Sequence, residues 1–100
     1  MPDKFISPER PPEGLDRELL TVLSEECCEV GQRVCKALRF DIAEVQPGQP
    51  MSNAQRIADE LGDLLGVMDC LMERGVLSDT DIELARAVKR VKLARFLQSQ

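Results

Sequence analysis

The chain has 100 residues, and its 18 acidic against 13 basic side chains give a formal net charge of −5, which argues against nucleic acids and anionic membranes as main partners. It contains no histidine, so Ser-His-Asp and Cys-His catalysis are excluded and hydrolysis would depend on carboxylates, lysines or metal-bound water. No apolar run approaches the ~20 residues of a membrane span, and the N-terminal stretch lacks the apolar core of a secretory signal, so we expect a cytoplasmic protein.

The chain begins with a predicted arm and continues as a single predicted domain. Residues 1–14 contain four prolines and no hydrophobic periodicity, which predicts an extended arm. Residues 15–100 form the domain. Its first helix is expected from about Leu15 to Phe40, because apolar residues recur there at helical spacing: Leu19, Leu23, Val30, Val34 and Leu38.

A loop and a second helix follow. The stretch 41–51 is rich in proline and glycine, which stop a helix. Ser52, with Gln55 three positions later, has the pattern of a capping box and predicts a helix start. This helix is expected to end near Gly75.

The third helix is expected to start at a second capping box, Thr80 with Glu83, and to continue through Phe96. No stretch is typical of a strand, so the fold class is all-α, a helical bundle. A chain of this length buries only part of its apolar surface, and we therefore expect the bundle to be completed by oligomerisation.

Each of the first two helices turns a pair of acids toward its apolar stripe. At roughly 100° per residue, Glu26 and Glu29 flank the stripe of the first helix. Glu60 lies within the stripe of the second helix and Asp63 at its edge. Buried, mutually repelling carboxylates are costly, and a divalent cation removes both costs. Because the ligands are all oxygens, we expect Mg²⁺, with Mn²⁺ as the alternative.

Other interpretations of these residues stay open. The pattern EExxE is also typical of solvated helix faces, where Glu29 would pair with Arg33 at the i,i+4 position. The four cysteines do not have the spacing of a zinc ribbon, and we expect them to be buried, reduced and apolar in character. Two acid pairs turned toward apolar stripes nevertheless favour a metal site.

The acid motifs resemble those of a known superfamily. EECCE, at Glu25–Glu29, and ELGD, at Glu60–Asp63, are similar to the EExxE and ExxD motifs of the MazG-like all-α nucleoside triphosphate pyrophosphatases. The segment KALRFDIAEVQPGQPMSNAQRIADELGDLLGVMD resembles the compact, single-module, phage-like branch. The resemblance extends over about residues 15–97.

The resemblance implies a Mg²⁺-dependent enzyme that hydrolyses nucleoside triphosphates, (d)NTP and water to (d)NMP and pyrophosphate, in nucleotide-pool sanitation. It also implies a homodimer or homotetramer. By position, the metal ligands would be Glu26, Glu29, Glu60 and Asp63. Glu25 would be a supporting acid that orients or deprotonates the attacking water. The catalytic candidates are Glu25, Glu26 and Lys36.

Substrate-binding candidates lie around the loop and on the third helix. Lys36 is seven residues past Glu29, within reach of a phosphate, although it could equally be a solvated lysine. A base could stack and hydrogen-bond at the loop ends, and Lys89 and Lys92 match positions where the superfamily tends to keep lysines. The candidates are Lys36, Arg39, Phe40, Asn53, Lys89 and Lys92.

Two alternative functions remain at this point. One is a non-catalytic helical module that oligomerises or binds nucleotide. The other keeps the enzyme but changes its substrate to phosphoribosyl-ATP or to a special pool such as dUTP or dCTP.

Overall fold

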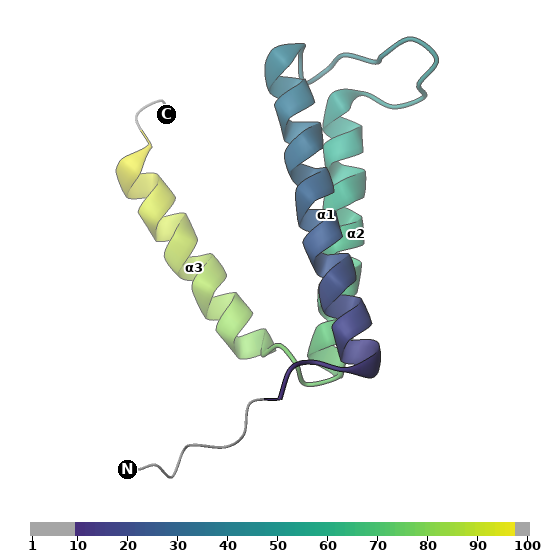
Figure 1. Ribbon diagram of the computed structural model, residues 1–100. Coiled ribbons are helices and arrows are strands. Elements are labelled where there is room, and N and C mark those ends of the chain that lie inside the picture. Colours follow the sequence, from purple (N-terminus) through teal and green to yellow (C-terminus); the bar gives the residue numbers. More distant parts are fainter. Residues whose placement is uncertain (1–9, 98–100) are drawn as a thin grey trace.

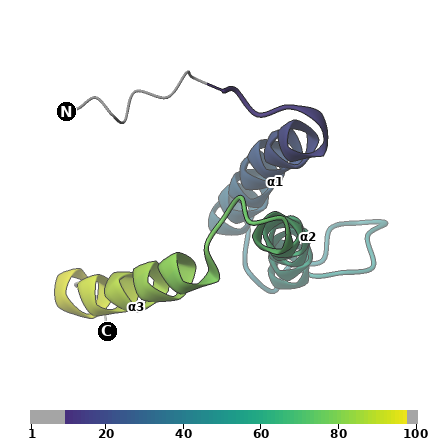
Figure 2. The same ribbon diagram turned by 90° about the horizontal axis from the view of Figure 1, so that it is seen from below.

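The structure, a computed structural model, describes residues 10–97 and consists there of three helices and no strand. They are α1 (Gly14–Arg39), α2 (Asn53–Glu73) and α3 (Asp79–Phe96). α1 and α2 lie side by side as an antiparallel hairpin, while α3 leads away from them (Figures 1 and 2). The expected all-α class is confirmed. Most of the predicted arm, residues 1–9, lies outside the described residues, and Gly14 already belongs to α1.

Local hydrogen bonds fix the end of the loop that leads into α2. The predicted capping box is present: Ser52 Oγ accepts from the Gln55 backbone N–H, and Gln55 Oε1 accepts from the Ser52 backbone N–H at 2.8 Å. Asn53, only 3% exposed, donates its side-chain amide to the Asp41 carbonyl at 2.7 Å and to Glu44 Oε1 at 3.3 Å. The loop is therefore tied to the first turn of α2.

The connection from α2 to α3 differs from the expectation. α2 ends where Gly75 takes a positive φ of 75°, which lets the Val76 N–H reach back to the Leu71 carbonyl at 2.9 Å. The N-cap of α3 is Ser78, whose hydroxyl accepts from the Asp81 N–H at 3.2 Å. The expected start at Thr80 was thus wrong, because an earlier serine supplies the cap and Thr80 lies within the first turn.

Helix packing is essentially confined to α1 and α2. Among the described residues, Leu71 is the only fully buried apolar side chain, with 0% exposure. The radius of gyration is 18.1 Å, whereas a compact domain of this length has about 13 Å. One copy of the chain therefore does not enclose a core of its own.

Much of the apolar surface is consequently open. On α3, Leu84, Val91 and Phe96 are 65%, 59% and 71% exposed. On α1, Leu38 is 81% exposed although it continues the predicted apolar stripe. The cysteines, expected to be buried, are all exposed in the single chain: Cys27, Cys28, Cys35 and Cys70. No helix in the described range is long and apolar enough to cross a membrane.

Candidate metal centre

Carboxylates from both helices of the hairpin meet between α1 and α2. Glu26 on α1 and Glu60 and Asp63 on α2 each offer one oxygen, and these oxygens lie within 4.8 Å of one another. The three-residue spacing puts Glu60 and Asp63 on neighbouring turns of one face. We call these three residues the acid cluster.

Two members of the acid cluster are held in an unfavourable environment. The Glu60 side chain is 12% exposed, and the Oε2 atoms of Glu26 and Glu60 are buried without a hydrogen-bond partner. Burial raises the pKa of Glu60 above its ordinary 4.5, and contact with the Glu29 side chain and repulsion by the other acids raise it further. Burial, followed by repulsion from Asp63 and Glu29, also raises the pKa of Glu26. Buried carboxylate oxygens are normally hydrogen-bonded, so a cationic partner would relieve both groups.

The other acids of the first motif are more peripheral. Glu29 is exposed, but it lies near enough to Glu60 to raise the pKa of that carboxyl group, so it borders the acid cluster. Glu25 is exposed, and its carboxylate makes the smallest of the contributions that raise the pKa of Glu26. It lines an open hollow with Arg17 and Thr21 instead of joining the cluster.

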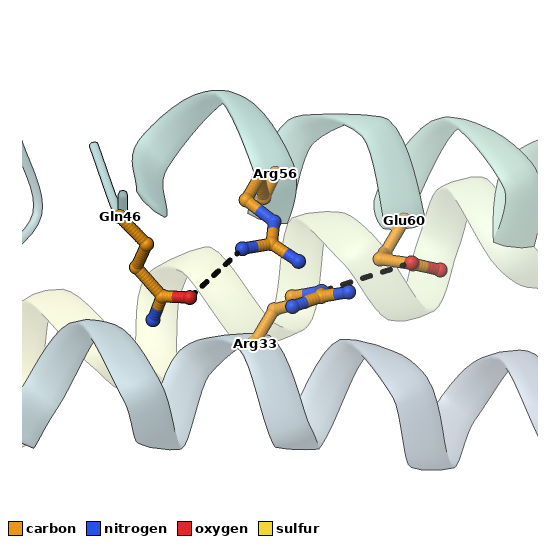
Figure 3. A network of polar contacts seen from close by, with 4 residues as sticks. All are labelled: Arg33, Gln46, Arg56 and Glu60. Carbon is orange, nitrogen blue, oxygen red and sulfur yellow. Dashed lines mark hydrogen bonds and ion pairs between the residues drawn. The ribbon is translucent and has the colours of Figure 1, made fainter. Parts of the chain in front are cut away.

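Two arginines lie next to the acid cluster (Figure 3). Arg33 of α1 points toward α2, and its Nε is 3.9 Å from Glu60 Oε1. Arg56 of α2 donates from Nη1 to Gln46 Oε1 in the loop at 3.3 Å. The alternative in which Arg33 pairs with Glu29 on a solvated face does not describe this arrangement, since its ion pair is with Glu60 across the hairpin.

The predicted substrate residues near the loop are dispersed. Lys36 and Arg39 are exposed and line an open groove formed by α1 residues alone. Phe40 is 54% exposed, with the Arg39 guanidinium 5.4 Å from its ring centre. The Asn53 amide group donates to the loop, which accounts for its burial without a ligand.

Lys89 and Lys92 lie on α3, are exposed, and are not brought to the acid cluster within one chain. A role for either lysine at this centre would need α3 to come from another copy. Their assignment to the substrate remains a prediction.

The acid cluster fits a hard divalent cation. Glu26, Glu60 and Asp63 each offer one oxygen, and these three oxygens lie within 4.8 Å of one another, so one ion placed among them could be approached by all three side chains. Carboxylate oxygens are the ligands that Mg²⁺ and Mn²⁺ prefer.

The pairing of Arg33 with Glu60 and the position of Arg56 beside it were not predicted from the sequence. The signal was present: Arg33 follows Glu29 by four residues, and Arg56 precedes Glu60 by four. Residues four apart share a helix face, so each arginine had to lie on the face that carries the acids.

No protein-family model matches the chain, and neither the curated proteins nor the solved structures include a significant match.

The raised pKa of Glu60 predicts that Glu60→Gln stabilises the metal-free protein at pH 7. Folding then requires an ionised carboxylate to be buried, whereas the neutral amide avoids that cost. Because the folded-state pKa lies above the ordinary 4.5, the cost is present at neutral pH and disappears as the pH falls below the ordinary value. Thermal unfolding in EDTA should show a melting temperature for Glu60→Gln above that of wild type at pH 7, with the gap shrinking toward pH 4.5.

Glu73→Gln, an exposed position on the same helix, is the control and should leave the melting temperature nearly unchanged. Equal melting temperatures for wild type and Glu60→Gln at pH 7 would show that burial of the Glu60 carboxylate does not destabilise the metal-free protein.

Proposed function

We propose that the chain is a Mg²⁺-dependent nucleoside triphosphate pyrophosphohydrolase. The observation that carries this proposal is the pair of buried, unpartnered carboxylate oxygens on facing helices, Glu26 Oε2 and Glu60 Oε2. Such oxygens destabilise the fold unless a cation binds them. The similarity of EECCE and ELGD to the superfamily motifs supplies the reaction class.

Each acid has a role in this proposal. Glu26, Glu60 and Asp63 would hold the cation, with Glu29 completing the set from its place beside Glu60. When bound, Mg²⁺ polarises phosphoryl oxygens and lowers the pKa of a coordinated water. Glu25, the exposed neighbour of Glu26, would orient the attacking water, which is the role that its position in the EExxE motif implies.

The bond changes define the products. The water oxygen forms a bond to the α-phosphorus, and the bond from that phosphorus to the bridging oxygen breaks. The bridging oxygen leaves with the electron pair as part of pyrophosphate. A carboxylate takes the proton of the water, and Glu25 and Glu26 are the candidates for this base.

The charge of the chain supports a reaction that depends on metal. The net charge is −5, and the centre itself is acidic. A triphosphate would be repelled from such a surface without a cation between them. We therefore expect metal to strengthen substrate binding at the acidic centre and to be needed for turnover.

The activity test is pyrophosphate release from the common NTPs and dNTPs with Mg²⁺. We expect release by wild type, a loss of at least about 100-fold in Glu60→Gln, and near wild-type rates in Glu73→Gln. A loss of this size corresponds to removing roughly 2.7 kcal/mol of transition-state stabilisation. EDTA should abolish release in wild type.

Either of two results would contradict the proposal: no turnover of any nucleotide by a folded, Mg²⁺-loaded protein, or full activity in Glu60→Gln. The first result would favour a non-catalytic helical module.

We further propose that the working form is a homodimer or homotetramer. The open apolar faces of α1 and α3 and the large radius of gyration support this, because a second copy could cover surface that one chain leaves in water. In an oligomer, α3 of one copy could also bring Lys89 and Lys92 to the acid cluster of another.

Sedimentation velocity tests the assembly. Wild type should sediment as a dimer or tetramer, and Val91→Glu should shift it to smaller species, because a charge would replace a 59% exposed valine in the interface. Thr80→Glu adds the same charge at an exposed polar position of α3 and is the control. A helical wild type that sediments as a monomer over the whole micromolar range would refute the assembly.

A further inference from the structure

Two guanidinium groups, those of Arg33 and Arg56, lie between α1 and α2 near Glu60, with Arg56 reaching toward Gln46 in the loop (Figure 3). Arg33 is four residues beyond Glu29 along α1, and Arg56 is four residues before Glu60 along α2. Since α1 and α2 run antiparallel, both arginines are displaced in the same direction, by about one helical turn or ~5.4 Å. Carboxylates and guanidinium groups therefore follow one another along the hairpin.

The partners of the two arginines leave most of their hydrogen-bonding capacity unused. Each guanidinium group carries five N–H donors. Within residues 10–97, Arg56 has one side-chain acceptor, the neutral Gln46 amide oxygen at 3.3 Å. Arg33 approaches Glu60 only to 3.9 Å, which is too far for a hydrogen bond. Neither arginine is fully solvated, since Arg33 is 26% exposed and Arg56 is also partly buried.

This arrangement favours an anion more than a further internal ion pair. Two like charges on facing helices repel each other, and a partly buried setting screens that repulsion less than open water does. The carboxylate paired with Arg33, that of Glu60, belongs to the acid cluster, and a cation bound there would compete for its charge. The ion pair between Arg33 and Glu60 would then be weakened, which leaves the Arg33 guanidinium group available to an anionic ligand.

We propose that Arg33 and Arg56 form a polyphosphate subsite that binds the β- and γ-phosphates of the substrate and holds pyrophosphate as it leaves. This inference rests on the proposed function. Planar guanidinium groups match phosphate oxygens with paired hydrogen bonds, which a lysine cannot reproduce. The acid cluster would face the α-phosphate through the cation, and the more highly charged end of the triphosphate would lie toward the arginines.

Gln46 connects the subsite to the loop. Its neutral amide oxygen accepts a hydrogen bond from Arg56, so the guanidinium group is oriented while its positive charge is not neutralised. Arg33 keeps its long contact with Glu60, so it is already extended across the hairpin toward α2 (Figure 3). Both groups are thus positioned before any ligand arrives, which lowers the cost of ordering them on binding.

Calorimetric titration of inorganic pyrophosphate into the Mn²⁺-loaded full chain tests the subsite. Arg56→Gln is the main variant because, within residues 10–97, the side-chain hydrogen bond of Arg56 goes to Gln46 and not to the acid cluster. We expect at least about tenfold weaker pyrophosphate binding than in wild type, with an intermediate loss in Arg56→Lys, which keeps the charge but loses the planar fork. AMP, which lacks the terminal phosphates, should bind almost equally to all three proteins.

The matched control is Arg86→Gln, which removes the same charge from α3, where Arg86 pairs with Glu83 at 3.3 Å. Its pyrophosphate affinity should equal that of wild type. Unchanged pyrophosphate affinity in Arg56→Gln, or an equal loss in Arg86→Gln, would overturn the subsite.

A parallel Mn²⁺ titration separates this inference from the proposed function. Equal Mn²⁺ binding by wild type and Arg56→Gln shows that the variant is folded and that the acid cluster is intact. If wild type binds no Mn²⁺, the metal proposal fails, and the pyrophosphate titration is repeated without metal. In that metal-free titration, pyrophosphate binding by wild type but not by Arg56→Gln would still support the subsite. If wild type binds no pyrophosphate either, the subsite proposal fails together with the metal proposal.

Discussion

Negative charge is buried between α1 and α2 at the centre of the hairpin's chemistry. Glu26 and Glu60 each bury a carboxylate oxygen that no donor satisfies, and Asp63 adds a third charge within 4.8 Å. An apolar side chain at the positions of Glu26 and Glu60 would avoid the cost of burying a charge. The proposed cation would stabilise the fold that keeps acids there, because ligand binding to the folded state adds directly to stability.

The charged side chains are ordered along the axis of the hairpin. The acids are followed, about one helical turn nearer the loop, by Arg33 and Arg56, and Asn53 ties the loop itself to the start of α2. A ligand with phosphates at one end and a neutral base at the other would meet cation, guanidinium groups and protein surface at different places along this axis. The open apolar faces on α1 and α3 do not belong to this charged axis. They remain in water because one copy of the chain does not enclose a core, and this supports the proposed oligomer.

Local signals in the sequence were sufficient for the helices and for the acid cluster. Periodicity predicted the helical class, and Ser52 with Gln55 predicted the start of α2. The wheel positions turned Glu26, Glu29, Glu60 and Asp63 toward the apolar stripes; three of these acids meet in the acid cluster, while Glu29 is exposed at its border. What failed depended on the surroundings of a residue. Ser78 and Thr80 are both good caps, so the first turn of α3 could not be placed by pattern alone. The cysteines and Leu38 look apolar, but their burial depends on a neighbour that one chain does not contain.

The most direct measurement of the central claim is an anomalous difference map from crystals of the full chain grown with Mn²⁺. The account predicts a peak between α1 and α2 at coordination distance from carboxylate oxygens of Glu26, Glu60 and Asp63. Mn²⁺ bound elsewhere, with these oxygens paired to Arg33 or to one another, would show that the buried acids do not form a metal centre. A peak at the predicted place would establish the centre before any substrate is known.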